Sequence, residues 1–582
     1  MATSRLRKLG NYLRPHWRMV LLGTLALLIV NVLGVYIPLL IRDSIDQLQG
    51  EFSFTQLSRS AIWLLLLSAI MWCFRMFSRT SIFGVGRQVE FGLKQTIFQH
   101  LLTIEPSYFA KNTSGDLINR ATSDVDNIRR LVGFAVLSFI NIIFAYGLTL
   151  PVMLRINVRL TLMAIAVYPV MLITVQLFSG KLRRYQEEVQ VKLSELSELI
   201  QEDMCGMALI RIYAQENQER EAFRQKNQEL LDANLKLART RNLLFPIIEG
   251  ISYISLLILL WQGTGAIADN LITIGDFIAL VLFVERLVFP TALLGFTITS
   301  YQQGEVSIDR VESITQAEPK IKNDSHPLAL PLSEIKGEIT ARQLTYRYPD
   351  APNSALSDLS FTVKPGETLA IVGSIGSGKS TLANAIPRLL NVAAGELFLD
   401  DCDITKLDLA TLRKAIAYVP QDSFLFSATI KNNIRYGEPL IETDEVIQAA
   451  KNAQINPEIL NFPQKYETLV GERGITLSGG QRQRTSLARA LLVDAKVLIL
   501  DDALSSVDNE TATKILESLS SARAKKTVIF ISHQLSAAAS CDRILVMDQG
   551  KIVQNGSHET LVQETGLYQS LWQQHQLEEV LN

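Results

Sequence analysis

The stretch that decides the fold of the C-terminal half is Gly373-Ser-Ile-Gly-Ser-Gly-Lys-Ser380. It matches the pattern GxxxxGK[ST] and lies between an apolar run, Leu369–Val372, and a helical segment, Thr381–Leu390. Glycines let the backbone N–H groups of such a loop converge on phosphate oxygens, and the following helix directs its positive end at them. We predict that Lys379 reaches the β- and γ-phosphates of a nucleotide and that the Ser380 hydroxyl binds Mg²⁺.

The sequence around this loop predicts an α/β domain. From Gly337 onward, short runs rich in β-branched residues alternate with helical stretches, a pattern that indicates a mostly parallel sheet. One of these runs, Val497-Leu-Ile-Leu-Asp501, is an apolar strand that ends in an acid. An Asp in this position holds Mg²⁺ through water in nucleoside triphosphatases. The motif is weak alone and gains weight from the phosphate loop upstream.

A second glycine-rich turn, Leu477-Ser-Gly-Gly-Gln-Arg-Gln-Arg484, lies between these motifs and opens a helix. A generic ATPase does not need two such turns. Here the chain resembles the ATP-binding cassette (ABC) transporters, whose signature reads LSGGQ. The resemblance covers the whole chain and implies a half-transporter of the multidrug or lipid exporter type. The other family motifs follow in the family's order, at Tyr348, Gln421, Val470–Gly474, Ser505–Asp508 and His533.

The resemblance implies a site shared by two cassettes that close head to tail. ATP and Mg²⁺ would lie between the phosphate loop of one chain and the signature turn of the other. The implied nucleotide-binding residues are Tyr348, which stacks on adenine, with Gly373, Ser374, Gly376, Ser377, Gly378, Lys379, Ser380, Thr381 and Gln421. The implied magnesium ligands are Ser380, Gln421 and, through water, Asp501; the implied catalytic residues are Asp502, His533 and Gln421. The implied contacts to the partner's ATP are Ser478, Gly479, Gly480 and Gln481, and the following loop contributes Ser505 and Asp508.

Asp502 departs from the family pattern, which has Glu at this position to polarise the attacking water. Asp is one methylene shorter and withdraws the carboxylate by roughly 1.5 Å, and a misplacement of ~1 Å costs ~100-fold in rate. We therefore expect this chain's own site to bind ATP and hydrolyse it slowly. With the signature intact, this combination resembles one half of a heterodimeric exporter, whose partner supplies the competent Glu. The alternative is a homodimer in which Asp502 serves as a less efficient base.

The N-terminal half predicts six transmembrane helices. Residues 1–582 are 48% hydrophobic, and the apolar residues gather in six runs. Each run is close to the ~20 residues that a helix needs to cross ~30 Å of hydrocarbon. The first run is too long for a signal peptide and has no small-residue cleavage site. The runs are Met19–Ile41, Ala61–Phe83, Leu131–Leu154, Leu160–Phe178, Leu243–Ala266 and Ile274–Ile298.

The distribution of Lys and Arg predicts that both termini lie in the cytoplasm. Lys and Arg concentrate before the first run and in the long segments 84–130 and 180–241, whereas the intervening loops are short and poor in them. Arg155 and Arg159 go against this pattern. We expect a multi-pass protein of the plasma membrane, or of the bacterial inner membrane if the source is prokaryotic. The net charge of −2 argues against a nucleic-acid partner.

The expected domains are a membrane domain over 1–310, a linker over 311–336 and a cassette over 337–582. The two long cytoplasmic segments have helical periodicity and are expected to extend out of the bilayer as stalks. We expect breaks at Asn112–Gly115, at Asp203–Gly206 and near Tyr213–Glu216. The first and last of these resemble the family's coupling helices, and Glu472 and Arg473 resemble the segment that meets them.

The transmembrane runs leave the cargo open, with a hydrophobic drug or lipid as the best expectation. Arg75, Glu249, Glu285 and Arg286 either face a cavity or pair with one another and reach the interface. Trp72, Trp261 and Phe283 either line a cargo path or act as packing and interface residues. The competing function is a non-transporting regulator or sensor driven by the same cassettes.

Overall fold

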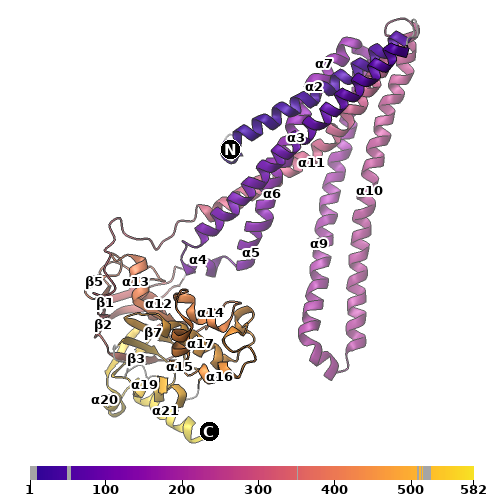
Figure 1. Cartoon of the computed structure of the whole chain (residues 1–582). Helices are drawn as coiled ribbons and strands as arrows, with labels where there is room; N and C mark the ends of the chain where they lie inside the picture. Colours follow the sequence, from indigo (N-terminus) through magenta and orange to yellow (C-terminus); the bar gives the residue numbers. More distant parts are fainter. Residues whose placement is uncertain are drawn as a thin grey trace. The chain divides into compact units, whose positions relative to one another are not determined.

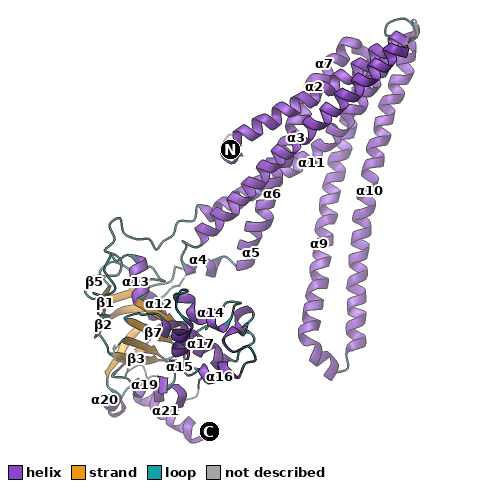
Figure 2. Cartoon of the chain, viewed as in Figure 1, coloured by secondary structure: helices purple, strands orange, loops and turns teal. Residues whose placement is uncertain are grey.

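The computed structural model describes residues 9–48, 54–349, 351–507, 510–512, 514–515 and 526–581. By their internal contacts the residues form two units. The first unit is Met1–Leu102 with Asn112–Ala317, and the second is Thr103–Lys111 with Glu318–Asn582. The first unit is helical and the second contains the strands (Figure 2).

The first unit consists of long helices, six of which are long and apolar enough to cross a membrane, as predicted. In the sequence of the third span, two π-helical turns, η2 (Arg120–Asp124) and η3 (Leu131–Ala135), join shorter α-helices. Helices α9 and α10 run side by side as a long hairpin (Figure 1). The helices are η1 (Arg14–His16), α2 (Trp17–Leu48), α3 (Phe54–Leu101), α5 (Ser114–Asn119), α6 (Val125–Arg130), α7 (Val136–Ile156), α8 (Val158–Ile165), α9 (Tyr168–Ile212), α10 (Glu216–Ala268) and α11 (Ile274–Thr315).

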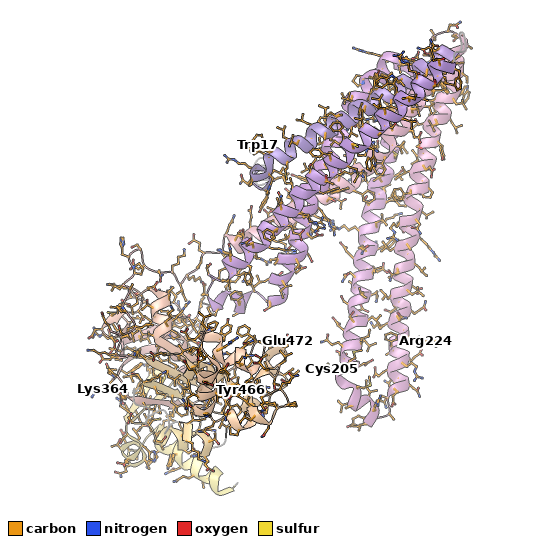
Figure 3. All side chains as sticks on the ribbon, in the orientation of Figure 1. Trp17, Cys205, Arg224, Lys364, Tyr466 and Glu472 are labelled. Carbon is orange, nitrogen blue, oxygen red and sulfur yellow. The ribbon has the colours of Figure 1, made fainter. Side chains whose placement is uncertain are left out.

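The structure confirms the expected helix breaks near Asn112–Gly115 and near Tyr213–Glu216, but the one expected at Asp203–Gly206 is wrong. Helix α9 continues through Asp203–Gly206, and Cys205, labelled in Figure 3, lies within it. A single glycine costs a helix only ~1 kcal/mol, and packing of α9 along α10 outweighs it. The chain turns at Ala214, within the expected break at Tyr213–Glu216, and Ala214 has a φ of 52°. The first break falls at Asn112–Thr113, and the short helix α4 (Pro106–Lys111) comes just before it.

The interior of the first unit also decides between two readings of the aromatic residues. Phe283 is fully buried in a cluster with Met153, Met171 and Leu259, so it packs helices together and does not line a cargo path. Trp72 and Trp261 are exposed on α3 and α10. Helix α11 continues to Thr315, five residues into the range expected for the linker.

The second unit contains the predicted parallel sheet and a smaller antiparallel sheet that the sequence analysis did not anticipate. The six-stranded sheet has the order β10-β9-β3-β8-β7-β6, and its strands are parallel except for β10. The antiparallel sheet has the order β2-β1-β4-β5. The strands are β1 (Ile339–Tyr346), β2 (Leu356–Val363), β3 (Thr368–Gly373), β4 (Leu397–Leu399), β5 (Cys402–Asp403), β6 (Ile416–Val419), β7 (Val497–Asp501), β8 (Thr527–Ile531), β9 (Arg543–Asp548) and β10 (Lys551–Gly556).

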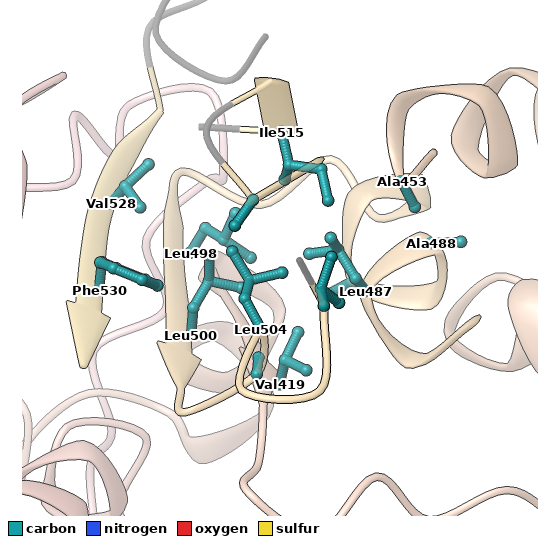
Figure 4. Close-up of a cluster of buried hydrophobic side chains, with 14 of the residues drawn as sticks. Val419, Ala453, Leu487, Ala488, Leu498, Leu500, Leu504, Ile515, Val528 and Phe530 are labelled. Atoms are coloured by element: carbon teal, nitrogen blue, oxygen red, sulfur yellow. The ribbon is translucent and has the colours of Figure 1, made fainter. Parts of the chain in front are cut away.

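Two apolar clusters hold this unit together. One cluster lies between the two sheets and includes Leu359, Ile371 and Leu399. The other cluster packs helices, among them α15 and α17, against the parallel sheet. Figure 4 shows Leu498 of β7 and Phe530 of β8 within this cluster. Besides α4, the described helices of this unit are α12 (Lys379–Ala385), α13 (Leu409–Ala415), α14 (Ile430–Ile434), η4 (Arg435–Gly437), α15 (Thr443–Asn452), α16 (Asn456–Asn461), η5 (Lys465–Glu467), η6 (Glu472–Gly474), α17 (Gly479–Leu492), α19 (Leu535–Ala539), α20 (His558–Gln563) and α21 (Leu567–Leu581).

Candidate functional site: a nucleotide cavity at the ends of four parallel strands

Four neighbouring parallel strands end at the candidate site. The phosphate loop follows β3, His533 follows β8, Asp501 and Asp502 end β7, and Gln421 follows β6. Ligands of open α/β sheets bind outside the carboxyl ends of the strands. The strand order therefore brings together residues that are separated by more than 150 positions in the sequence.

The glycines of the phosphate loop are required by its backbone. Gly376 and Gly378 have φ values of 80° and 99°, a region that side chains strain. A Cβ on Gly373 would lie 1.9 Å from the carbonyl oxygen of Met547, and one on Gly378 would lie 2.5 Å from that of Ala355. The loop therefore packs too closely on its neighbours to accept any other residue at these two positions.

Lys379 is buried at the centre of the loop. Its ammonium donates to the carbonyl oxygens of Gly373 and Ser374, each at 2.9 Å. Burial lowers the pKa of Lys379, and the nearby charges of Asp502 and Asp501 oppose this shift. The two carboxylates therefore help to keep the ammonium charged, which phosphate binding requires.

Ser380 and Asp501 form the candidate magnesium site. The Ser380 hydroxyl donates to Asp501 Oδ1 at 3.0 Å, and the Tyr418 hydroxyl donates to Oδ2 at 3.2 Å. Burial raises the pKa of Asp501, although both hydrogen bonds favour its ionised form. A carboxylate beside a hydroxyl suits Mg²⁺, which takes one or two protein oxygens and completes its shell with water and phosphate. The residues present therefore fit the ion that the motif implies.

Asp502 is held mainly through its backbone. It has a φ of 49°, and its N–H donates to the carbonyl oxygen of Ile531 at 2.8 Å. The side-chain atom Oδ1 is buried and accepts no hydrogen bond from the described part of the chain. The distance that the Asp502 carboxylate extends from the backbone therefore depends on the length of its own side chain.

Most of the predicted nucleotide-binding residues line one cavity of about 350 Å³. Gly373 and Ser374 do not line it: Gly373 packs on Met547, and Ser374 donates to Asp548. Ala355, Ile375 and Ile531 also line the wall, and Tyr418 bonds to Asp501, although none of the four was predicted. Ile375 occupies a variable position of the phosphate-loop pattern, and Ala355 and Tyr418 belong to no motif. The predicted residues in the wall are Tyr348, Gly376, Ser377, Gly378, Lys379, Ser380, Thr381, Gln421, Asp501, Asp502 and His533.

The signature turn is built as a helix N-terminus away from this cavity. Ser478 caps α17 and accepts a hydrogen bond from the Gln481 N–H at 3.3 Å, while the Gln481 side chain accepts one from the Ser478 N–H at 3.0 Å. This reciprocal cap contributes about 1 kcal/mol to helix stability. A Cβ on Gly480 would lie 2.8 Å from the carbonyl oxygen of Ser506. Ser478, Gly479, Gly480 and Gln481 are not among the described residues that line the cavity.

The loop after Asp502 is tied to the signature helix. Gln483 of α17 donates to Ser505 Oγ at 2.9 Å and accepts a hydrogen bond from the Ser506 N–H at 2.8 Å. Two hydrogen bonds therefore connect this loop to the helix that the signature turn opens. Asp508, the other residue predicted in this loop, lies outside the described residues.

The segment predicted to meet the coupling helices is an exposed turn before the signature. Arg473 has a φ of 52° between Gly471 and Gly474, whose φ values are 67° and 75°. Glu472 is exposed on this turn and is labelled in Figure 3. Arg473 is exposed as well, and the positive φ values of the turn are readily adopted at its two glycines.

Two family models match the chain, one for each unit of the fold. The ABC transporter transmembrane region matches residues 20–291, and the ABC transporter model matches residues 356–505. The chain is also similar in fold to a bacterial Atm1-family ABC exporter with ATP bound, with a TM-score of 0.76 and 24% identity over 97% of this chain and 99% of that one.

Full-length relatives are more similar in sequence. The probable multidrug resistance ABC transporter ATP-binding/permease protein YheI of Bacillus subtilis (strain 168) is 32% identical, over 99% of this chain and 98% of the relative. The ATP-dependent lipid A-core flippase of Syntrophus aciditrophicus (strain SB) is 32% identical, over 99% of this chain and 94% of the relative. The chain therefore belongs to the ABC transporter family and carries the membrane region and the ATP-binding cassette in one polypeptide.

Proposed function

We propose that this chain exports or flips hydrophobic or amphipathic compounds outward across the membrane, driven by ATP, as one half of a heterodimer. The observation that carries the proposal is the fusion of six membrane-capable helices to a cassette with both a phosphate loop and a signature turn. Two relatives that match over the whole chain, a probable multidrug resistance transporter and a lipid A-core flippase, support it. A hydrophobic drug or lipid is therefore the proposed cargo.

The proposed location follows from the charge distribution. We place both termini on the cytoplasmic side of the plasma membrane, or of the bacterial inner membrane, because Lys and Arg are most frequent in the segments on that side. The cassette then meets cytoplasmic ATP. The break at Asn112–Thr113 and the turn at Ala214 are the positions that we propose for the family's coupling elements.

In the proposed cycle, the residues of the phosphate loop that line the cavity bind and orient ATP. Lys379 exchanges its bonds to the carbonyl oxygens of Gly373 and Ser374 for bonds to the β- and γ-phosphates. Ser380, Gln421 and, through water, Asp501 would hold Mg²⁺, which would supply positive charge to the phosphate oxygens. Tyr348 stacks on adenine and His533 donates to the γ-phosphate. The partner's signature turn adds the N–H groups of a helix N-terminus on the other side of the nucleotide.

Asp502 supports the heterodimer. Its backbone is fixed by the bond to Ile531, so the shorter side chain cannot regain the missing reach. This chain's site then retains ATP, while its intact signature turn, Ser478–Gln481, completes the partner's faster site. Two alternatives predict different behaviour: a homodimer that uses Asp502 as its base, and a non-transporting regulator.

Measuring ATP hydrolysis by the purified full chain separates the heterodimer from the homodimer. The proposal predicts low turnover by the chain alone and a large increase when a partner half-transporter is added. Brisk turnover by the chain alone that disappears in Asp502→Asn would establish the homodimer instead. Copurification from native membranes shows independently whether a second half-transporter accompanies the chain.

A further inference from the structure

The membrane unit contains a cavity of about 600 Å³ between α2, α3, α7 and α11. This volume is in the range of pockets that take small organic ligands. Most of the wall is apolar, but three arginines, two asparagines and one serine also face it. No Asp or Glu is among the described residues of the wall. The cavity therefore combines an apolar lining with a positive charge of three.

Arg286 of α11 is positioned by hydrogen bonds to α2. Its Nη2 donates to the backbone carbonyl oxygen of Asn31 at 2.9 Å and to Asn31 Oδ1 at 3.1 Å. Asn31 is buried and donates in turn to Asn141 Oδ1 at 3.0 Å. The guanidinium packs directly on Gly34, where a Cβ would lie 2.1 Å from Nη1. Arg286 is thus held in one orientation by neutral oxygens, and its buried Nη1 has no hydrogen-bond partner among the described residues.

Arg75 and Arg79 reach the same cavity from one face of α3. Arg75 lies within electrostatic range of both Arg79 and Arg286. None of the ion pairs found between described residues includes any of these three arginines. Glu285, beside Arg286 in sequence, is within electrostatic range of Tyr253 on α10. The arginines therefore do not pair with the membrane glutamates, which was one of the two readings of the sequence.

We propose that this cavity selects an amphiphile with an anionic headgroup, such as a phosphate, and an apolar tail. Uncompensated charges in a membrane segment mark cargo or ion pathways. The guanidinium groups offer paired N–H donors whose geometry matches phosphate and carboxylate oxygens. The apolar wall accepts the tail, so the ligand is a membrane-dissolved compound and not a free inorganic anion. This inference rests on the proposed export function, because it names the cargo class of that path.

Binding to the full chain in lipid nanodiscs tests the inference without ATP. The two probes share one fluorescent alkyl tail, and one carries a phosphate headgroup while the other carries a quaternary ammonium. We expect the phosphate probe to bind at least about tenfold more tightly, and Arg286→Gln or Arg79→Gln to remove about tenfold of its affinity, the usual effect of losing a hydrogen bond to a charged group. Arg155→Gln, an exposed arginine of α7 outside the cavity, is the matched control and should change neither affinity.

Several outcomes would overturn the inference. Equal affinity for the two probes, or phosphate-probe binding that neither variant weakens, would show that the arginines do not select cargo. Competition by inorganic phosphate would show that the tail is not required. Arg79 is exposed, so Arg79→Gln carries the test if Arg286→Gln does not fold. ATP-driven transport of cationic dyes without anion binding would refute the inference alone, and anion binding without any ATP-driven transport would refute the proposed function alone.

Discussion

Lengthening the side chain at Asp502 is expected to accelerate ATP hydrolysis by this chain's own site. The N–H of Asp502 is bound to the carbonyl oxygen of Ile531 at 2.8 Å, so the backbone cannot advance toward the nucleotide. The added methylene of Asp502→Glu extends the carboxylate by about 1.5 Å. A displacement of ~1 Å changes rates ~100-fold, which corresponds to about 2.7 kcal/mol of activation free energy. Asp502→Glu is therefore expected to raise the ATP turnover of a homodimer of this chain by one to two orders of magnitude.

The assay is steady-state ATP hydrolysis by the full chain in nanodiscs at saturating ATP. Glu is strained by roughly 1 kcal/mol at a φ of 49°, so ATP retention and thermal stability are measured in parallel. Asp401→Glu is the matched control: it makes the same substitution at another aspartate of positive φ, whose side chain is exposed to solvent. It should leave ATP turnover unchanged. If wild type already turns over briskly and Asp502→Glu adds nothing, the argument from side-chain length is wrong.

Three further outcomes follow from the geometry of the cassette. Gly378→Ala should abolish ATP binding, because its Cβ would meet the Ala355 carbonyl oxygen at 2.5 Å; near-normal affinity in a fluorescent-ATP titration would contradict this. Gly480→Ala should displace the signature turn from the Ser506 carbonyl oxygen and slow the heterodimer's hydrolysis, while ATP binding to this chain's own loop stays normal; equal loss of both would contradict it. Burial raises the pKa of Asp501, so protonation begins at a higher pH than for an ordinary Asp, and Mg²⁺-dependent ATP affinity should weaken on acidification before the Mg²⁺-independent part does; a parallel decline would argue against Asp501 as a ligand.

The sequence predicted those parts of the fold whose signal is local. Six apolar runs predicted six membrane-capable helices, and short β-branched runs that alternate with helical stretches predicted a mostly parallel sheet. Features that depend on distant partners were not predicted. The antiparallel sheet needs β1 to pair with both β2 and β4, and the unbroken α9 depends on packing along α10.

The same distinction holds for the candidate site. Motif residues such as Lys379 and Asp501 could be predicted from their spacing, because the strand, loop or helix that positions each of them is formed by its neighbours in the sequence. Tyr418, which bonds to Asp501, and Gly34, which makes room for Arg286, belong to no motif and act across the fold. From the sequence, Arg286 was only a charged residue in an apolar run. Its hydrogen bond to Asn31 is seen only in the structure.

Cargo movement in inverted membrane vesicles tests the proposed function most directly. Vesicles that contain the chain and its partner half-transporter are given ATP with a hydrophobic dye or a labelled lipid, and Lys379→Ala serves as the matched variant without a functional phosphate loop. The account predicts ATP-dependent accumulation of the compound that is strongly reduced by Lys379→Ala. ATP hydrolysis without accumulation of any compound would contradict it and favour a regulator driven by the same cassettes.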